Sequence, residues 1–415
     1  MAQPTQDERE FDIILFGATG FAGALVAEYF AEHNDPPRWA MAGRNLEKLE
    51  KLRAELSDDF PAIADVDLVV ADSNDEASLE AMAERAKVIC STVGPYAKYG
   101  SALVKACIDK GTHYCDLTGE AQWVRAMIDA HHEQAREAGV RIVTCCGFDS
   151  IPSDLGTLML QHHALETHGR PCTQVKFFMA KVRGGFSGGT VASMLELLEQ
   201  ASKDRSILKV LGHPYSLNPE GERKGPDGSD QKWIRYDEDA RAWTAPFLMA
   251  AINTKIVRRS NALLDYKYGR EFRYSEVTRM SSGPSGMFAA AMMALGLGGF
   301  TMALMQEQTR ALLEKFVLPS PGEGPSREMI DSGFFEVRLV GHIEGRTEIV
   351  RGKVRGERDP GYGATATMLG ESAICLALDQ DKFESEGGIL TPASAMGMPL
   401  VERLRDAGMT FEVTS

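Results

Sequence analysis

The stretch that decides the fold is F-D-I-I-L-F-G-A-T-G-F-A-G, Phe11–Gly23, together with the residues that follow it as far as Arg44. It opens with a mostly apolar run, which is typical of a strand buried in a parallel sheet. A glycine turn follows, then a helical pattern over residues 24–32 and a second apolar run, Trp39–Ala42. Strand, glycine turn, helix and strand in this order predict the first half of a dinucleotide-binding unit.

The turn carries three glycines, Gly17, Gly20 and Gly23, in the spacing G-x-x-G-x-x-G. Glycine lets the backbone turn sharply and approach a pyrophosphate closely, and it lets a helix pack tightly on a strand. The phosphates are then expected at the helix N-terminus, where free N–H groups and the helix dipole favour negative charge. The alternative is a turn with a structural role only. The expected cofactor-binding residues of this stretch are Gly17, Ala18, Thr19, Gly20, Phe21 and Gly23.

The tip of the second strand indicates which dinucleotide is bound. The ribose 2′-hydroxyl of NAD prefers an acidic acceptor there, whereas the 2′-phosphate of NADP prefers a guanidinium. The tip is Gly43-Arg44-Asn45, without Asp or Glu. We therefore expect NADP(H), bound through Gly43 and Arg44; the alternative is that Arg44 is a solvated cation at the start of a helix.

Length and charge limit the possibilities further. A chain of 415 residues is long for a single core, so two domains are expected. A net charge of −14 disfavours nucleic acid as a partner, because phosphates would be repelled. Seven cysteines without a C-x-x-C pair suit reduced thiols, and the polar N-terminus has no apolar core of a signal peptide. A cytoplasmic protein is expected.

Strands and helices alternate strictly as far as residue 145, which predicts a doubly wound parallel sheet of the Rossmann type. Ligands of such sheets bind beyond the carboxyl ends of the strands. The expected third to sixth strands cover residues 66–71, 88–93, 112–117 and 140–145, and Ser73 is expected to cap the helix after the third. The strand ends so mapped add Asp72, Val93, Gly94, Pro95 and Tyr96 to the expected cofactor site, followed by residues 116–120 and 147–150.

The pattern changes beyond Asp154. Residues 173–182 form a β-branched strand, and residues 334–344 and 346–356 predict an antiparallel hairpin. Residues 214–231, rich in Gly, Pro and charge, predict an exposed loop. We expect an NADP-binding domain over residues 1–154 and an α+β domain with a mostly antiparallel sheet over 155–358. The segment 359–415, with an apolar helix over 365–378, is expected to return to the first domain.

The segment Met280–Gln306 contains no charged residue. Its length allows a membrane span, although its Gly, Ala and Met content makes it less hydrophobic than most spans. Three alternatives stay open: a buried or homodimer-interface helix, a lipid-facing surface or acyl-binding wall, and a true span. Peripheral membrane contact through residues 280–306 and a homodimer are both expectations from this segment.

Several motifs together resemble the saccharopine dehydrogenase-like oxidoreductases, within them the mycobacterial trans-acting enoyl reductases and their bacterial and animal relatives. The matching stretches span nearly the whole chain in order: residues 17–23, 42–44, 93–96, 114–120, 146–154, 187–190 and 359–362. The resemblance implies a Rossmann domain with an α+β domain. It also implies either saccharopine-type imine reduction or enoyl reduction, and it includes members without an established reaction.

Physical arguments favour one of these activities. A dicarboxylate amino acid would need several convergent Arg or Lys residues, whereas the uncharged segment Met280–Gln306 suits an apolar substrate. We expect NADPH-dependent reduction of a carbon–carbon double bond in a lipid-like small molecule. The alternatives are a saccharopine-type imine dehydrogenase and a non-catalytic NADP-binding scaffold associated with lipid or membrane.

Three side chains at strand ends are candidates for catalysis. Tyr96 is expected near the nicotinamide; its alternative is a packed aromatic at a turn. Asp116 follows the fifth strand, as does Glu120, and either one could cap a helix instead. Ser150 precedes Pro152 and has the same alternative. Ser187–Thr190 could hold an anion or a carbonyl group. No metal motif is present, and no metal is expected.

Overall fold

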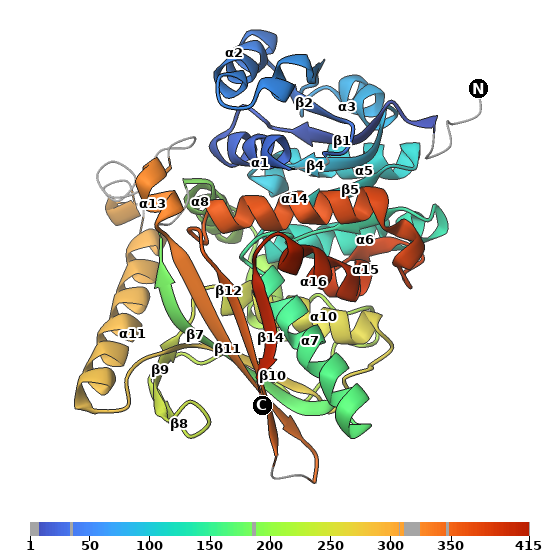
Figure 1. The fold of residues 1–415 in the computed structure, drawn as a ribbon. Coiled ribbons are helices and arrows are strands. Elements are labelled where there is room, and N and C mark those ends of the chain that lie inside the picture. The colour runs from blue at the N-terminus through green and yellow to red at the C-terminus, as the bar shows by residue number, and fades with distance from the viewer. Residues whose placement is uncertain are drawn as a thin grey trace. The chain divides into compact units, whose positions relative to one another are not determined.

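Figure 1 shows the computed structural model of the chain, which describes residues 8–33, 36–184, 188–306, 308–310, 324–345 and 348–414. The chain forms two compact units. The first contains Met1–Phe148 and Tyr362–Ala407, and the second contains Asp149–Gly361 and Gly408–Ser415. These limits differ from the expected 1–154, 155–358 and 359–415 by a few residues at each boundary. They also differ in the last eight residues, which belong to the second unit.

The first unit is built on a parallel sheet, sheet A, with the strand order β13-β6-β5-β4-β1-β2-β3 among the described residues. Every pairing in it is parallel, as the alternating pattern predicted. The order reverses between β1 and β4, which lie side by side. The strands are β1 (Phe11–Phe16), β2 (Trp39–Gly43), β3 (Asp67–Val70), β4 (Ala86–Ser91), β5 (His113–Asp116), β6 (Arg141–Val143) and β13 (Gly388–Leu390).

Helices cover this sheet, and one of them comes from the far end of the sequence. Helix α14 (Gly363–Leu378), buried along nearly its whole length, packs against α1, β1, β4 and β5 (Figure 1). The other helices of the unit are α1 (Phe21–Glu32), α2 (Leu46–Ser57), η2 (Pro61–Asp65), α3 (Glu76–Ala83), α4 (Tyr96–Tyr99), α5 (Ser101–Lys110), α6 (Ala121–Glu137), η3 (Gln380–Lys382), α15 (Pro392–Ala395) and α16 (Gly397–Asp406).

The second unit is built on sheet B, with the strand order β14-β12-β11-β7-β10-β9-β8 among the described residues. Only the β7–β10 pairing there is parallel, which confirms the prediction of a mostly antiparallel sheet. The predicted hairpin is β11 and β12. The strands are β7 (Cys172–Arg183), β8 (Arg235–Asp237), β9 (Ala242–Pro246), β10 (Arg273–Arg279), β11 (Phe334–Ile343), β12 (Ile349–Gly356) and β14 (Thr410–Thr414).

Two helices, α7 and α10, lie against sheet B and against each other. They bury most of their side chains, polar ones included. The helices that the structure describes in this unit are α7 (Ile151–His168), α8 (Gly188–Lys203), α9 (Ser206–Gly212), α10 (Ala250–Leu263), α11 (Pro284–Met305) and α13 (Arg327–Asp331).

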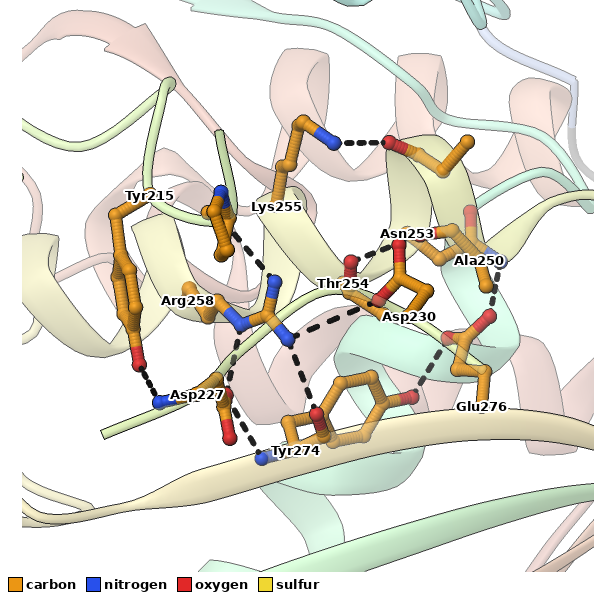
Figure 2. A network of polar contacts seen from close by, with 12 residues as sticks. Tyr215, Asp227, Asp230, Ala250, Asn253, Thr254, Lys255, Arg258, Tyr274 and Glu276 are labelled. Atoms are coloured by element: carbon orange, nitrogen blue, oxygen red, sulfur yellow. Dashed lines mark hydrogen bonds and ion pairs between the residues drawn. The ribbon is translucent and has the colours of Figure 1, made fainter. Parts of the chain in front are cut away.

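The prediction of an exposed loop over residues 214–231 holds for much of residues 219–231, which are exposed or half-buried, but it is wrong for residues 215–218. Leu217 is fully buried and Asn218 is 1% exposed. The cause lies on α10, where the buried Arg258 donates to a carboxylate oxygen of Asp227 at 2.8 Å and to the carbonyl of Pro214 at 3.1 Å (Figure 2). An arginine that is itself buried needs such acceptors, and the loop supplies them.

Helix α11 is the uncharged segment. Only 17% of its most apolar window is buried, so it is not a core helix of this chain, and a homodimer interface, a lipid- or acyl-facing surface and a membrane span stay open. Its large apolar side chains are exposed, Phe288 by 67% and Met302 by 69%. Among the described residues, α11 is the one helix long and apolar enough to cross a membrane by length and composition. Exposed apolar patches in soluble proteins are commonly sites of interaction.

Candidate functional site

The glycine turn after β1 has a backbone that only glycine suits at its first position. Gly17 has φ of +92°, in the region that disfavours residues with a Cβ. A Cβ on Gly17 would also lie 2.7 Å from Oγ1 of Thr92 and 2.7 Å from Cγ2 of Val93. The turn closes when the N–H of Gly20 donates to the carbonyl of Gly17 at 2.9 Å. The end of β1 is therefore packed directly against the end of β4.

Gly23 brings the helix close to the strand. Helix α1 begins at Phe21 instead of the expected Ala24, so Gly23 lies in its first turn. A Cβ on Gly23 would lie 2.1 Å from the carbonyl oxygen of Gly17, far inside van der Waals contact. The close packing predicted for the third glycine is confirmed.

The N-terminus of α1 has its first N–H groups available to an anion. The cap residue is Gly20, no side chain accepts from the first turn, and the first turn has no acidic residue. Neighbouring α2 and α3 differ, because Asn45 accepts from the N–H of Lys48 and Asp75 accepts from the N–H groups of Ala77 and Ser78. The prediction of Ser73 as the cap of α3 is therefore wrong. Of these three helices, α1 presents uncapped N–H groups, as phosphate binding requires.

The side chains around the turn divide into exposed and buried ones. Ala18 is fully buried, whereas Thr19 and Gly20 are exposed. The ring of Phe21 packs edge-on against Tyr362 with their centroids 4.5 Å apart. Tyr362 stands at the start of α14 in the same unit. It is the last residue of the stretch 359–362 that resembles the family, and its ring connects that stretch to the glycine turn.

Arg44 and Asp72 stand at the carboxyl ends of β2 and β3. The two strand ends are joined by the N–H of Ala71, which donates to the carbonyl of Gly43 at 3.1 Å. Arg44 is exposed. The pKa of Asp72 is lowered, first by the backbone N–H of Asn74 and also by the nearby positive charge of Arg44. The guanidinium of Arg44 therefore belongs to the residue that follows β2, the strand next to β1, and Arg44 is open to solvent.

Tyr96 has its hydroxyl engaged inside the protein. It is 3% exposed, its hydroxyl donates to the carbonyl of Ser91 at 3.0 Å, and its ring packs on Trp123. Its backbone N–H donates to one carboxylate oxygen of Glu120 at 2.9 Å, and the N–H of Ala97 donates to the other at 2.8 Å. Glu120 therefore caps α4, and the geometry favours the packed-aromatic alternative for Tyr96.

Asp116 is fully buried and joins two strand ends. One oxygen accepts from the N–H groups of Thr118 at 3.0 Å and Cys145 at 3.1 Å, and the other accepts from the hydroxyl of Tyr114 at 2.9 Å. Burial raises the pKa of Asp116 to about 7, although these hydrogen bonds act in the opposite direction. Its contacts connect the β5 loop to the residues after β6.

Ser150 lies in the second unit, so the structure places it on a different body from Tyr96 and Asp116. It is fully buried, and its hydroxyl donates to the side-chain oxygen of Asn253 at 3.1 Å. Asn253 in turn donates to Glu276 at 3.0 Å, and the hydroxyl of Tyr274 donates to Glu276 at 2.8 Å (Figure 2). Burial raises the pKa of Glu276 to about 7.

This polar network on α10 and β10 is the feature that the sequence reasoning missed. It also holds Lys255, whose ammonium donates to the carbonyl of Ala251 at 2.7 Å and whose pKa burial lowers to about 8 (Figure 2). A signal was present in the sequence, since residues 250–263 place Lys, Arg and Asn on a helix amid apolar residues. Within the described residues, no group of three or more His, Cys, Asp or Glu side chains could hold a metal ion. Of the candidate stretch Ser187–Thr190, Ser187 lies outside the described residues, and the other three form the start of α8.

Mycobacterial proteins resemble this chain over nearly its whole length. A Mycobacterium tuberculosis protein provisionally named a trans-acting enoyl reductase is 43% identical over 421 residues, 99% of each chain. A trans-acting enoyl reductase of Mycobacterium bovis is 39% identical over 98% of each chain. That of Mycobacterium leprae is 38% identical over 98% of this chain and 99% of its own. The chain belongs to this family. It is an oxidoreductase.

Two further comparisons agree with the family's fold. Residues 13–143 match the family model described as the saccharopine dehydrogenase NADP binding domain. The solved structure of saccharopine dehydrogenase (L-Glu forming) from Saccharomyces cerevisiae matches 97% of this chain and 99% of its own chain. The TM-score is 0.53 and the sequence identity is 14%. The predicted cofactor, NADP(H), is therefore confirmed, and the residues present fit it. Gly17 and Gly23 leave room that a Cβ would fill, and α1 presents uncapped N–H groups.

Proposed function

We propose that this oxidoreductase reduces the carbon–carbon double bond of an α,β-unsaturated acyl group in a lipid-like substrate. NADPH, when bound, would supply a hydride to the β-carbon, and water would supply a proton to the α-carbon, so that the double bond would become a single bond. The observation that carries the proposal is the full-length similarity to proteins named trans-acting enoyl reductases.

The cofactor contacts that we propose follow sheet A. Uncapped N–H groups of α1 and the glycine turn would hold the pyrophosphate: Gly17, Ala18, Thr19, Gly20, Phe21 and Gly23. Gly43, Arg44 and Asp72 would surround the adenosine ribose, with the Arg44 guanidinium on the 2′-phosphate. Val93, Gly94, Pro95 and Tyr96 would border the nicotinamide half at the end of β4.

The three catalytic candidates take supporting roles in this proposal. Tyr96 and Asp116 hold the β4, β5 and β6 ends together through buried hydrogen bonds. Ser150 fixes the start of α7 to α10. Their hydroxyl donors and carboxylate oxygens are used inside the protein, so a proton for the substrate is supplied more readily by solvent.

The exposed helix α11 supports a lipid-like substrate. The buried positions described in its first three turns are small residues, Gly286, Ala290 and Ala294, and Leu304 is buried near its end, whereas large apolar side chains such as Phe288, Met292 and Leu295 are exposed. We propose that this surface contacts the acyl chains of lipid or of the substrate at a membrane surface, with the enzyme otherwise in the cytoplasm. A second copy of the chain, in a homodimer, is the competing occupant.

The alternative of a saccharopine-type imine dehydrogenase has weaker support, because the 14% identical solved structure supports the fold alone. The test is oxidation of NADPH by the purified protein with either a long-chain 2-enoyl thioester or 2-oxoglutarate plus lysine. Turnover of the enoyl thioester alone is expected. Turnover of the imine pair alone would overturn the proposal, and NADPH binding without turnover of either would favour the non-catalytic scaffold.

A further inference from the structure

Two buried glutamines of this chain have opposite hydrogen-bonding states. Gln161 in α7 is 1% exposed; its amide nitrogen donates to the carbonyl of Cys172 at 2.9 Å, and its amide oxygen accepts from the N–H of Cys172 at 2.8 Å. Gln122 in α6 is 8% exposed, and neither its amide nitrogen nor its amide oxygen has a partner among the described residues. Burying an amide without partners is costly, so such a group needs an explanation.

Gln122 stands at the carboxyl edge of sheet A. It is the second residue of α6, directly after the loop that ends β5. Glu120, two residues earlier, binds the backbone N–H groups of Tyr96 and Ala97 at the end of β4. Trp123, the next residue, packs on Tyr96. Gln122 therefore belongs to the β4–β5 side of the point where the strand order reverses.

The dinucleotide is expected to extend towards that side. In sheets of this type it binds across the crevice where the strand order reverses, which here lies between β1 and β4. If Arg44 at the end of β2 takes the 2′-phosphate, the adenosine half lies over β2 and β3. The nicotinamide half then lies over β4 and β5, on the side of Gln122.

The nicotinamide ring carries a primary carboxamide, with one carbonyl acceptor and one N–H₂ donor. A glutamine side chain offers the same two groups, so the two amides can pair through two hydrogen bonds. A thioester carbonyl has only an acceptor and would leave the amide oxygen of Gln122 without a partner. We propose that Gln122 binds the carboxamide of the nicotinamide ring through its side-chain amide.

The proposal rests on the proposed orientation of NADP(H), with its 2′-phosphate at Arg44, and not on the acyl substrate. Both amide atoms are covered from solvent. To pair with Gln122, the carboxamide would displace the atoms that cover it and would satisfy an amide that has no partner among the described residues.

The test is calorimetric titration of wild-type protein and the Gln122→Met variant with three ligands. These are NADP⁺, its 3-acetylpyridine analogue, which lacks the amide N–H₂, and 2′-phospho-ADP-ribose, which lacks the ring. Compared with the wild type, the variant is expected to bind NADP⁺ about tenfold more weakly and 2′-phospho-ADP-ribose equally well. Its affinity for the 3-acetylpyridine analogue is expected to fall less than its affinity for NADP⁺. Equal affinity of both proteins for NADP⁺, or equal weakening of all three ligands, would overturn the proposal. Because no acyl substrate is used, the outcome is independent of the enoyl reductase assay.

Thermal denaturation without cofactor separates ligand binding from a structural role. Gln122→Met removes an amide that has no partners, so the melting temperature should stay the same or rise. Gln161→Met is the matched control and should lower it, because Cys172 loses both partners. A lowered melting temperature for Gln122→Met with unchanged NADP⁺ affinity would assign Gln122 to structure and overturn the proposal.

Discussion

A Cβ on Gly23 would lie 2.1 Å from the carbonyl oxygen of Gly17. These two residues bring α1 onto the end of β1 and set the N-terminus of the helix beside the turn. Since a backbone carbonyl cannot swing away as a flexible side chain can, any larger residue at position 23 must push the helix outward.

We expect Gly23→Ala to destabilise the protein by about 1–3 kcal/mol and to weaken NADPH binding at the same time. The reason is that the displaced α1 no longer points its N–H groups at the pyrophosphate. Thermal denaturation and fluorescence titration with NADPH measure the two effects. Gly298→Ala is the control, since its Cβ would meet nothing within 4 Å and should stabilise α11 by about 0.5–1 kcal/mol. Unchanged NADPH affinity in Gly23→Ala would contradict the assignment of this turn.

Arg44 should decide between the two nicotinamide dinucleotides. Charge-assisted hydrogen bonds to a 2′-phosphate contribute about 1.5–3 kcal/mol, so Arg44→Ala should weaken NADPH binding roughly 10- to 100-fold. NADH binding should not change, because NADH lacks the phosphate. Titration with both cofactors measures the ratio.

Lys48→Ala is the matched control for Arg44→Ala, because Lys48 is also an exposed cation at the start of α2. It should leave both affinities unchanged. If Arg44→Ala weakened NADH as much as NADPH, the guanidinium would act on something other than the 2′-phosphate.

The parts of the fold that the sequence predicted are those encoded locally. The apolar run of β1 depends on residues within a few positions, and the same holds for the cap of α2 at Asn45 and the end of α5 at Gly111 in the structure. Gly111 has φ of +68° and closes its helix in the left-handed conformation, as a C-terminal glycine commonly does.

The parts that were missed depend on partners far away in the chain. β13 has three residues and pairs with β6, more than 240 residues earlier, so no local pattern marks it. The loop over residues 214–231 is polar in composition, yet Arg258 and Arg259 on α10 bind its first residues, of which 215–218 are buried. Composition predicts exposure only when no buried partner is supplied from elsewhere.

The candidate site was predicted by position better than by role. Tyr96 and Asp116 do stand at strand ends of sheet A, where ligands of this fold bind. Ser91, which accepts from Tyr96, is close in sequence. Leu117, which donates to Tyr96, and Cys145, which donates to Asp116, become neighbours only when the sheet is assembled. A side chain's role as donor or as support could therefore not be read from its position alone.

Glu120 should control the loop at the end of β4. Its two oxygens accept from Tyr96 N–H and Ala97 N–H, and glutamine has only one acceptor oxygen. Glu120→Gln would leave one buried N–H facing an N–H₂ group, at a cost of about 1–3 kcal/mol. We expect a lower melting temperature and a raised KM for NADPH.

The control for Glu120→Gln is Asp75→Asn. Asp75 also accepts from two backbone N–H groups, Ala77 and Ser78, but it is exposed at the start of α3. Asn caps helices about as well as Asp, so stability and KM should stay nearly unchanged. A raised KM in both variants would show that any lost helix cap disturbs the site.

Asp116 should make stability depend on pH. Burial raises its pKa to about 7 from the usual 3.8, so the folded state binds this proton more tightly than the unfolded chain does. Its contribution is therefore fully present below about pH 4 and is lost as the pH rises to about 7. Asp116→Asn should remove this loss, which amounts to at most about 4 kcal/mol.

Urea denaturation of wild type and Asp116→Asn at several pH values between 4 and 7.5 measures the difference. Glu276, whose pKa burial also raises to about 7, is present in both proteins and cancels in the comparison. The free energy of unfolding of the wild type should fall relative to the variant as the pH rises. A difference that is constant over this range would contradict the raised pKa of Asp116.

Helix α11 should bind lipid through its exposed side chains. Burying a side chain of the size of Phe288 contributes about 1.5–3 kcal/mol, so Phe288→Glu should weaken binding to phosphatidylcholine vesicles roughly 10- to 100-fold. NADPH affinity and melting temperature should not change, because Phe288 is 67% exposed. Leu208→Glu is the control, since Leu208 is exposed by 48% on α9, and it should bind vesicles as the wild type does. If Phe288→Glu instead converted a dimer to a monomer in light scattering, with no vesicle binding by either protein, the occupant of α11 would be a second copy of the chain.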